Sequence, residues 1–170
     1  MSAVNTLPIR DMAKSTTGCC PPFNPDEWDA QTFEFKDKLF VKVSTSSLFY
    51  IPLNMSSVMR RVKAKIDKAV ADNTQSSFML SQDVSPWRAE HYVAVDKDVP
   101  GEQMAHLSGT YVVKVFEGEY KNMPIWHQKL LDYVKTLGKT ASQTYFSYAM
   151  CPKCAKTYGH NYVAGFAQVA

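Results

Sequence analysis

The sequence has no run of about 20 consecutive apolar residues, and its N-terminus lacks a basic start followed by an apolar core. A membrane-spanning helix needs such a run and a secretory leader needs such a start, so neither is expected. The excess of positive over negative charge is also small, because 19 Lys and Arg residues against 16 Asp and Glu residues leave a net charge of +3. That excess is too small to indicate a nucleic-acid surface. We therefore expect a cytoplasmic protein with neither nucleic-acid nor membrane partners.

A glycine-rich phosphate loop and a recognisable Ser-His-Asp arrangement are also missing, and the four histidines share no spacing. Neither a nucleotide-binding site nor a hydrolase built on a catalytic triad is therefore predicted. The 170 residues, of which 45% are hydrophobic and 21% charged, have the size and composition of one globular domain. The sequence is compatible with a monomer or a homodimer.

Cysteine is scarce too, with four residues in two close pairs. In a cytoplasmic protein, such pairs are more often thiols or metal ligands than disulfides. Cys151 and Cys154 form a C-x-x-C pair, which supplies half of a structural zinc site. The adjacent Cys19 and Cys20 make an awkward second pair, and His160 is a possible substitute ligand. Three interpretations stay open: a structural zinc, a redox-active or packed thiol pair, and a disulfide between the N-terminal arm and a loop. We expect no catalytic cofactor.

Hydrophobic periodicity, by contrast, is well developed and recurs in one order. Residues 1–38 contain many residues that break helices and sheets, and they predict an extended N-terminal arm packed on a domain formed by residues 39–170. That domain shows strand, helix, strand and strand twice, at about 39–100 and about 101–170. The predicted fold class is α+β, with two tandem strand-helix-strand-strand repeats forming antiparallel sheet and with helices on one side.

The best-patterned stretch is the predicted strand from Leu107 to Tyr120. Side chains alternate between the two faces of a strand, so Tyr111 and Glu117 share one face. A predicted helix carrying Trp126 follows almost at once. This strand is therefore expected to form one wall of an aromatic pocket for a small molecule.

Several motifs resemble the GyrI-like small-molecule-binding superfamily over about residues 39–170. The resemblance rests on the duplicated element order, on Arg88-Ala-Glu-His-Tyr-Val-Ala-Val before Val99-Pro-Gly, and on Leu107-Ser-Gly-Thr-Tyr leading to Glu117-Gly-Glu-Tyr and Trp126. The motifs Cys151-Pro-Lys-Cys-Ala-Lys, Tyr158-Gly-His-Asn-Tyr and Thr17-Gly-Cys-Cys-Pro look like a stand-alone branch labelled only as hydrolase. The resemblance implies a central ligand cleft between the two repeats, lined by aromatic rings.

The resemblance also implies a chemistry. Some stand-alone members hydrolyse cyclopropane-bearing, DNA-alkylating compounds by means of a carboxylate and a tyrosine that direct water. Many members carry a glutamate on the penultimate strand, where this chain has Phe146 and its neighbours, so the carboxylate must be Glu90, Glu117 or Glu119. Water attack needs a base and a donor for the developing negative charge. The resulting catalytic candidates are Glu90, Glu117, Tyr111 and Tyr145.

Flat side chains that a planar ligand can stack on form a second candidate set. These ligand-binding candidates are Trp87, Tyr92, Tyr120, Trp126, Tyr148, Tyr162 and Phe166. The simpler alternative for each ring is a place in the core, and for each glutamate a solvated or cation-paired strand end. We expect a cofactor-independent hydrolase that detoxifies electrophilic aromatic molecules. The main alternative is a non-catalytic module that binds or sequesters such ligands; an inhibitor of a partner protein is a third class, for which the sequence offers no motif.

Overall fold

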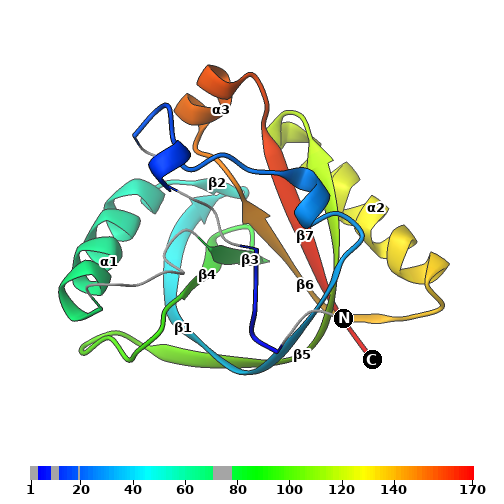
Figure 1. Cartoon of the computed structure of the whole chain (residues 1–170), viewed down its shortest axis with the longest axis horizontal. Helices are drawn as coiled ribbons and strands as arrows, with labels where there is room; N and C mark the ends of the chain where they lie inside the picture. Colours follow the sequence, from blue (N-terminus) through cyan, green and yellow to red (C-terminus); the bar gives the residue numbers. More distant parts are fainter. Residues whose placement is uncertain (1–3, 9–11, 19, 71–77) are drawn as a thin grey trace. The chain divides into compact units, whose positions relative to one another are not determined.

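The computed structural model describes residues 4–8, 12–18, 20–70 and 78–170. Strands and α-helices follow one another along the chain as Figure 1 shows. Their bounds are β1 Thr32–Leu48, β2 Ile51–Pro52, α1 Met55–Ala69, β3 Met79–Ser85, β4 Arg88–Ala94, β5 Met104–Glu117, α2 Met123–Thr136, β6 Ala141–Tyr148, α3 Pro152–Tyr158 and β7 Tyr162–Val169.

The chain divides into two compact units, which are described separately. Unit 1 contains Met1–Lys36 and Ser108–Ala170, and unit 2 contains Asp37–Leu107. Unit 1 therefore holds the start of β1, most of β5, and all of α2, β6, α3 and β7. Unit 2 holds the remainder of β1, the short strand β2, α1, β3, β4 and the first residues of β5.

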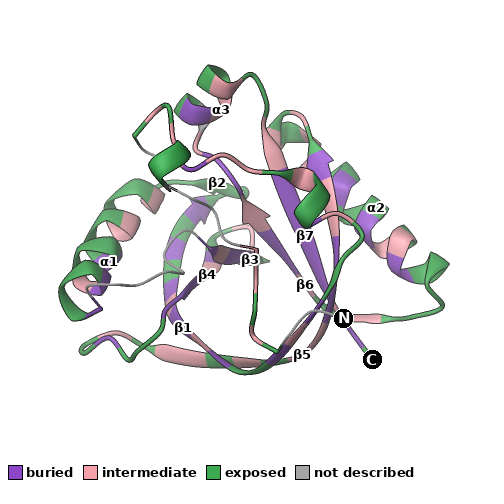
Figure 2. Cartoon of the chain, in the orientation of Figure 1, coloured by how far each residue is buried: buried purple, intermediate pink, exposed green. Residues whose placement is uncertain are grey.

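Unit 1 is built on antiparallel strands in the order β6, β7, β5. Strand β7 is buried over most of its length, as Figure 2 shows, because both of its faces are covered. On one face α2 contributes Trp126, Leu130 and Val134 to a core cluster. Gly165 of β7 allows this close approach, since a Cβ atom there would lie only 3.0 Å from Cδ2 of Leu130.

The other face of the unit 1 strands is covered by aromatic rings from the N-terminal segment. Trp28 and Phe33 pack against Phe166 of β7, with ring centroids 6.2 Å and 6.1 Å away. Phe35 packs against Tyr111 of β5 at 4.8 Å. The segment before β1 is also tied to β5 by backbone hydrogen bonds, in which the Ala30 N–H donates to the Val113 carbonyl at 2.9 Å. Residues early in the chain are thus part of this core.

Unit 2 contains the antiparallel order β2, β1, β4, β3. Apolar residues recur at helical spacing in α1, and its buried Val62 and Ile66 join a core cluster with Val41, Val43 and Val93 of the strands. The turn between β1 and β2 uses left-handed backbone at Phe49 and Tyr50, whose φ angles are 48° and 69°.

The predicted fold class is wrong, because the chain is mostly β. In the described part of the chain there are seven strands and three α-helices, and β1 alone has 17 residues. The expected helices on one side do not describe unit 1, where α2 covers one face of the sheet and N-terminal aromatic rings cover the other. The cavity described below is lined by unit 1 alone.

Two local patterns explain the difference. Strand β1 begins at Thr32, where Phe33 and Phe35 alternate with polar residues at the two-residue period of a strand. The prolines that precede this segment favoured an arm instead. Residues 152–158, for which no element was predicted, form α3, which has a proline in its first turn and a left-handed Gly159, with φ of 77°, at its C-terminal end.

Candidate active site

A cavity of ≈ 580 Å³ lies in unit 1 where β5 ends and β7 begins. It is lined by Glu117 at the end of β5 and residues 118–120 after it, by Ala155 and Lys156 of α3, and by residues 159–161 before β7. The antiparallel register pairs Glu117 with Tyr162, so the segments flanking these two positions meet at one edge of the sheet. These segments therefore bring together side chains that are about 40 residues apart in the sequence.

Two hydrogen bonds hold the edges of this cavity together. The Gly118 N–H donates to the Asn161 carbonyl at 3.1 Å, and the Asn161 side-chain amide donates to the Gly118 carbonyl at 2.7 Å. Gly118 has φ of 139°, a conformation that side chains other than glycine rarely adopt. The chain can therefore turn sharply at the end of β5 and keep Glu117 beside the start of β7.

The chemically distinctive feature of the cavity is a pair formed by Glu117 and His160. His160 Nδ1 lies 2.7 Å from Glu117 Oε1. A carboxylate in its ionised form can only accept this hydrogen bond from Nδ1, and in the neutral form of the ring Nε2 then keeps its lone pair. The imidazole also stacks on the ring of Tyr162, with centroids 5.5 Å apart and planes inclined by 16°. Carboxylate and aromatic ring together orient a base.

Water has access to this pair. The side chains of His160 and Glu117 are 55% and 53% exposed to solvent. Lys156 lines the same cavity and brings a positive charge to it. A histidine oriented by a carboxylate, with a cation in the same cavity, is a set of groups able to activate water and to stabilise negative charge on a substrate.

Tyr120 forms part of the cavity wall rather than a donor to it. Its hydroxyl donates to the Met150 carbonyl at 2.7 Å, and its ring meets that of Tyr148 at 5.5 Å in an edge-on contact. Burial raises the pKa of the Tyr120 hydroxyl, and the nearby Cys151 and Cys20 add to the increase. Tyr120 therefore stays neutral and presents an aromatic surface.

The structure places the predicted donors Tyr111 and Tyr145 in the core of unit 1. Tyr111 is fully buried and Tyr145 is 5% exposed, with ring centroids 6.3 Å apart. Glu117 shares a strand face with Tyr111, but six residues of strand separate them by about 20 Å. A shared face therefore does not bring this tyrosine to the carboxylate.

Glu90, the other predicted base, lies in unit 2 and is engaged by cations. Lys42 Nζ is 2.6 Å from its Oε2 atom, and Arg88 is 3.7 Å from Oε1. The hydrogen bond with Glu90 raises the pKa of Lys42. Tyr92 OH lies 3.5 Å from the same carboxylate, and Lys42 Nζ lies 5.7 Å from the centroid of the Tyr92 ring. These residues form an ion-paired cluster of their own.

The remaining predicted ligand-binding rings are distributed over several environments. Trp126 is 4% exposed and stacks on Phe116 in the core of unit 1, and Phe166 is fully buried. Trp87, in unit 2, is 53% exposed and contacts Phe49 with ring centroids 4.9 Å apart. Of the seven rings predicted, Tyr120 lines the cavity, while Tyr148 and Tyr162 support groups that line it.

His91 is a buried histidine in unit 2 with a structural environment. Its two ring nitrogens each lie 2.8 Å from a hydroxyl oxygen, that of Thr45 at Nε2 and that of Ser81 at Nδ1. Burial lowers the pKa of His91 from 6.5 to about 4. The folded protein therefore keeps this ring neutral at pH values where the unfolded chain protonates it.

This difference predicts a pH dependence of stability. Above pH 6.5 His91 is neutral in both the folded and the unfolded state, and its contribution to stability is complete. Between pH 6.5 and 4 the imidazole is protonated in the unfolded chain but not in the folded protein. The free energy of unfolding should therefore fall by about 3 kcal/mol over that interval. NMR titration of the imidazole resonances checks the cause, with His91 expected to titrate near pH 4. Titration of His91 at pH 6 or above would refute it.

Three cysteines converge beside the cavity, at the N-terminal end of α3. The sulfur atoms of Cys20, Cys151 and Cys154 all lie within 4.8 Å of one another. The Cys20 and Cys151 sulfurs are 3.8 Å apart, and burial raises the pKa of Cys20 to about 12. Cys19, the fourth cysteine considered as a ligand, lies outside the described residues.

The sequence indicated His160 only as a possible zinc ligand, and its contact with Glu117 was not predicted because the four histidines show no shared spacing. The available signal was positional: His160 lies two residues before β7, and Glu117 ends β5. Lys156 and Asn161 were not predicted as site residues either, because neither belongs to a catalytic motif. Only the pairing of β5 with β7 brings these residues to one cavity.

Comparison with known proteins gives one family. A family model described as "Bacterial hydrolase" matches residues 10–169. A search of curated proteins finds no match. Among the described residues, no helix is both long and apolar enough to cross a membrane.

Proposed function

Because the chain belongs to the bacterial hydrolase family, we propose that it hydrolyses a small electrophilic molecule in the cavity that Glu117 and His160 line. The observation that carries this proposal is the 2.7 Å contact between His160 Nδ1 and Glu117 Oε1 within a cavity open to water. The pair supplies the base that water attack requires, and it needs no triad serine.

The proposed reaction begins when His160 Nε2 takes a proton from a water molecule as the water oxygen attacks the electrophilic carbon. The imidazolium that forms is stabilised by Glu117, whose carboxylate remains ionised. As the new C–O bond forms, the bond to the leaving group breaks and its electron pair moves to the leaving atom. His160 then returns the proton to that atom. Atoms and charge balance, and both catalytic groups return to their starting states.

Lys156 has a distinct proposed role, as an electrostatic partner for the negative charge that develops on the substrate. A cation aimed at developing charge is most effective when water is excluded. Because the pair is open to solvent, the bound substrate itself must displace water from it. The flat rings of His160 and Tyr120 favour a planar substrate that covers them.

For the substrate class, we propose a planar aromatic molecule with an activated electrophilic carbon, such as a cyclopropane-bearing DNA-alkylating compound. In that substrate the bond that breaks is a ring C–C bond, and its electrons move into the conjugated carbonyl. The cavity has a volume of ≈ 580 Å³ and is widely open to solvent, so a ligand bound there stays partly exposed. The GyrI-like resemblance and a detoxifying role stay predictions from the sequence.

The test is turnover by the purified full chain on a panel of spirocyclopropane alkylators, aromatic epoxides and activated aryl esters. Mass spectrometry should detect the water adduct or the hydrolysed ester at a rate above that of buffer for at least one class. No turnover on any class would overturn the hydrolase proposal. Thermal stabilisation by compounds that are recovered intact would overturn it in favour of a binding module.

A further inference from the structure

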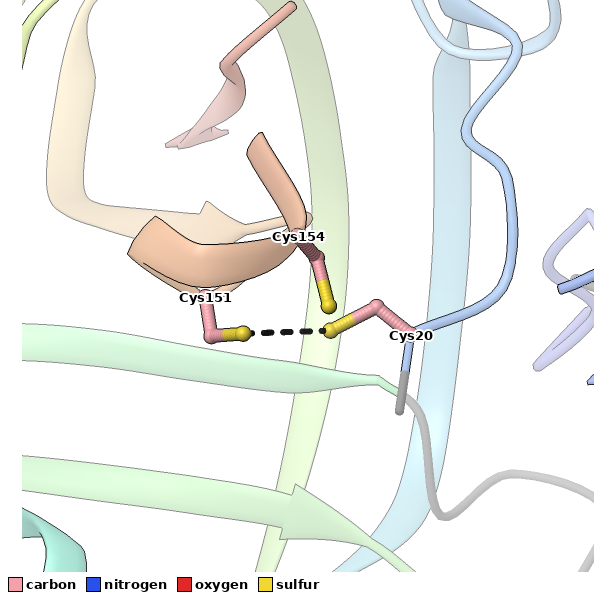
Figure 3. A group of neighbouring side chains, drawn as sticks. All are labelled: Cys20, Cys151 and Cys154. Carbon is pink, nitrogen blue, oxygen red and sulfur yellow. Dashed lines mark hydrogen bonds between the residues drawn. The ribbon is translucent and has the colours of Figure 1, made fainter. Parts of the chain in front are cut away.

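We propose that Cys20, Cys151 and Cys154 bind one zinc ion that ties the N-terminal segment to α3. Figure 3 shows the three side chains directing their sulfur atoms into a common space from two separate segments of the chain. Cys151 directly precedes α3, Cys154 lies in its first turn, and Cys20 comes from the segment before β1.

The spacing of the sulfurs matches a metal site better than a disulfide. Zinc–thiolate bonds of about 2.3 Å in a tetrahedron place two sulfurs about 3.8 Å apart. The Cys20 and Cys151 sulfurs are 3.8 Å apart, whereas a disulfide would require about 2.05 Å. All three sulfurs lie within 4.8 Å of one another, so a small inward movement is enough for one ion to contact all three.

The loop that carries Cys20 is held in position by hydrogen bonds on its backbone. The hydroxyls of Ser15 and Tyr158 both donate to the Cys20 carbonyl, at 2.7 Å and 2.9 Å. Because Tyr158 belongs to α3, the two ligand-bearing segments are already joined without metal. Ser15, Cys20 and Tyr158 therefore already join the two ligand-bearing segments before any metal binds.

A second hydroxyl contacts a sulfur directly. Thr17 Oγ1 lies 3.3 Å from the sulfur of Cys154, which is fully buried, and it also accepts the Cys20 N–H at 3.3 Å. When zinc replaces the thiol proton, the Thr17 hydroxyl can turn and donate to the thiolate. Hydrogen bonds of this kind orient ligands and tune a metal site.

The donor set selects the metal. Three thiolates favour a soft or borderline ion, and a compact site of single sulfur atoms suits zinc. Binding one Zn²⁺ releases three thiol protons and leaves the fourth tetrahedral position for a ligand beyond these three cysteines. Since Ala155 and Lys156 of α3 line the neighbouring cavity, the ion would stiffen the helix that forms one of its walls.

The test begins with metal analysis of the untagged full chain, purified under reducing conditions and then dialysed against a small excess of zinc. We expect about one equivalent of bound zinc, and less than a tenth of an equivalent in Cys151→Ser and Cys154→Ser. The matched control is Lys153→Ser, an exposed position between the two cysteines, which should keep the full equivalent. Less than a tenth of an equivalent in the wild type, or full retention in both cysteine variants, would overturn the proposal.

A second measurement does not depend on the variants folding. Cobalt(II) added to the metal-free wild type should give the near-ultraviolet charge-transfer absorption of thiolate ligands and the visible bands of a tetrahedral ion, both removed by added zinc. Wild-type spectra without these bands would overturn the site. A wild-type mass lower by two hydrogens, with no bound metal under non-reducing conditions, would replace it with a disulfide.

Discussion

Replacing His160 with alanine is expected to lower kcat by roughly 10²- to 10⁴-fold on any substrate that the wild type hydrolyses, the range for loss of a general base. KM should change much less, because the imidazole acts on the attacking water and contributes little to substrate binding. The measurement is steady-state kinetics of both proteins. Unfolding in urea should show little loss of stability, since more than half of the His160 side chain is exposed.

The matched control for this prediction is His127→Ala. His127 is an exposed histidine of α2 that contacts the Thr144 hydroxyl at 3.2 Å and does not line the cavity. Its replacement should leave kcat within about twofold of the wild-type value. If His160→Ala keeps more than a tenth of the wild-type kcat, His160 is not the base.

The second large effect is expected on stability. Trp28→Ala should lower the free energy of unfolding by about 3–5 kcal/mol, the range for removing a buried aromatic side chain. Trp28 is 2% exposed and contacts the rings of Phe23, Phe33 and Phe166. Its removal leaves a cavity in the aromatic layer of unit 1. Urea unfolding, followed by far-ultraviolet circular dichroism, measures the loss.

Trp87→Ala provides the comparison, because it removes the same side chain from a position that is 53% exposed. We expect it to cost less than about 1 kcal/mol. Equal losses in the two variants would show that the segment around Trp28 is not an integral part of the unit 1 core.

Local periodicity was sufficient to predict several elements. The apolar stripe from Met123 predicted the helix observed as α2, and the β-branched run around Val112 predicted β5. The predicted and observed elements agree because each is determined by residues that are close together in the sequence. The helix expected within residues 39–100 is observed as α1.

The fold class and the contact between Glu117 and His160 depend on long-range pairings that periodicity does not encode. Phe33 and Phe35 alternate as in a strand, but only their contacts with Phe166 and Tyr111 show that they complete a core. Glu117 was predicted as a candidate from its place at the end of a strand, whereas His160 became visible only through the register of β5 against β7. Sequence position made Glu117 a candidate, and the pairing of β5 with β7 places His160 beside it.

The most direct test of the catalytic pair is a double-mutant cycle on kcat, with His160→Ala, Glu117→Gln and the double variant compared on the best substrate from the panel. If Glu117 acts only by orienting His160 and stabilising its imidazolium, the kcat of the double variant should be no lower than that of His160→Ala alone. The kcat of Glu117→Gln should be higher than that of His160→Ala and that of the double variant. Losses that multiply in the double variant, or single variants as fast as the wild type, would contradict a catalytic role for this pair.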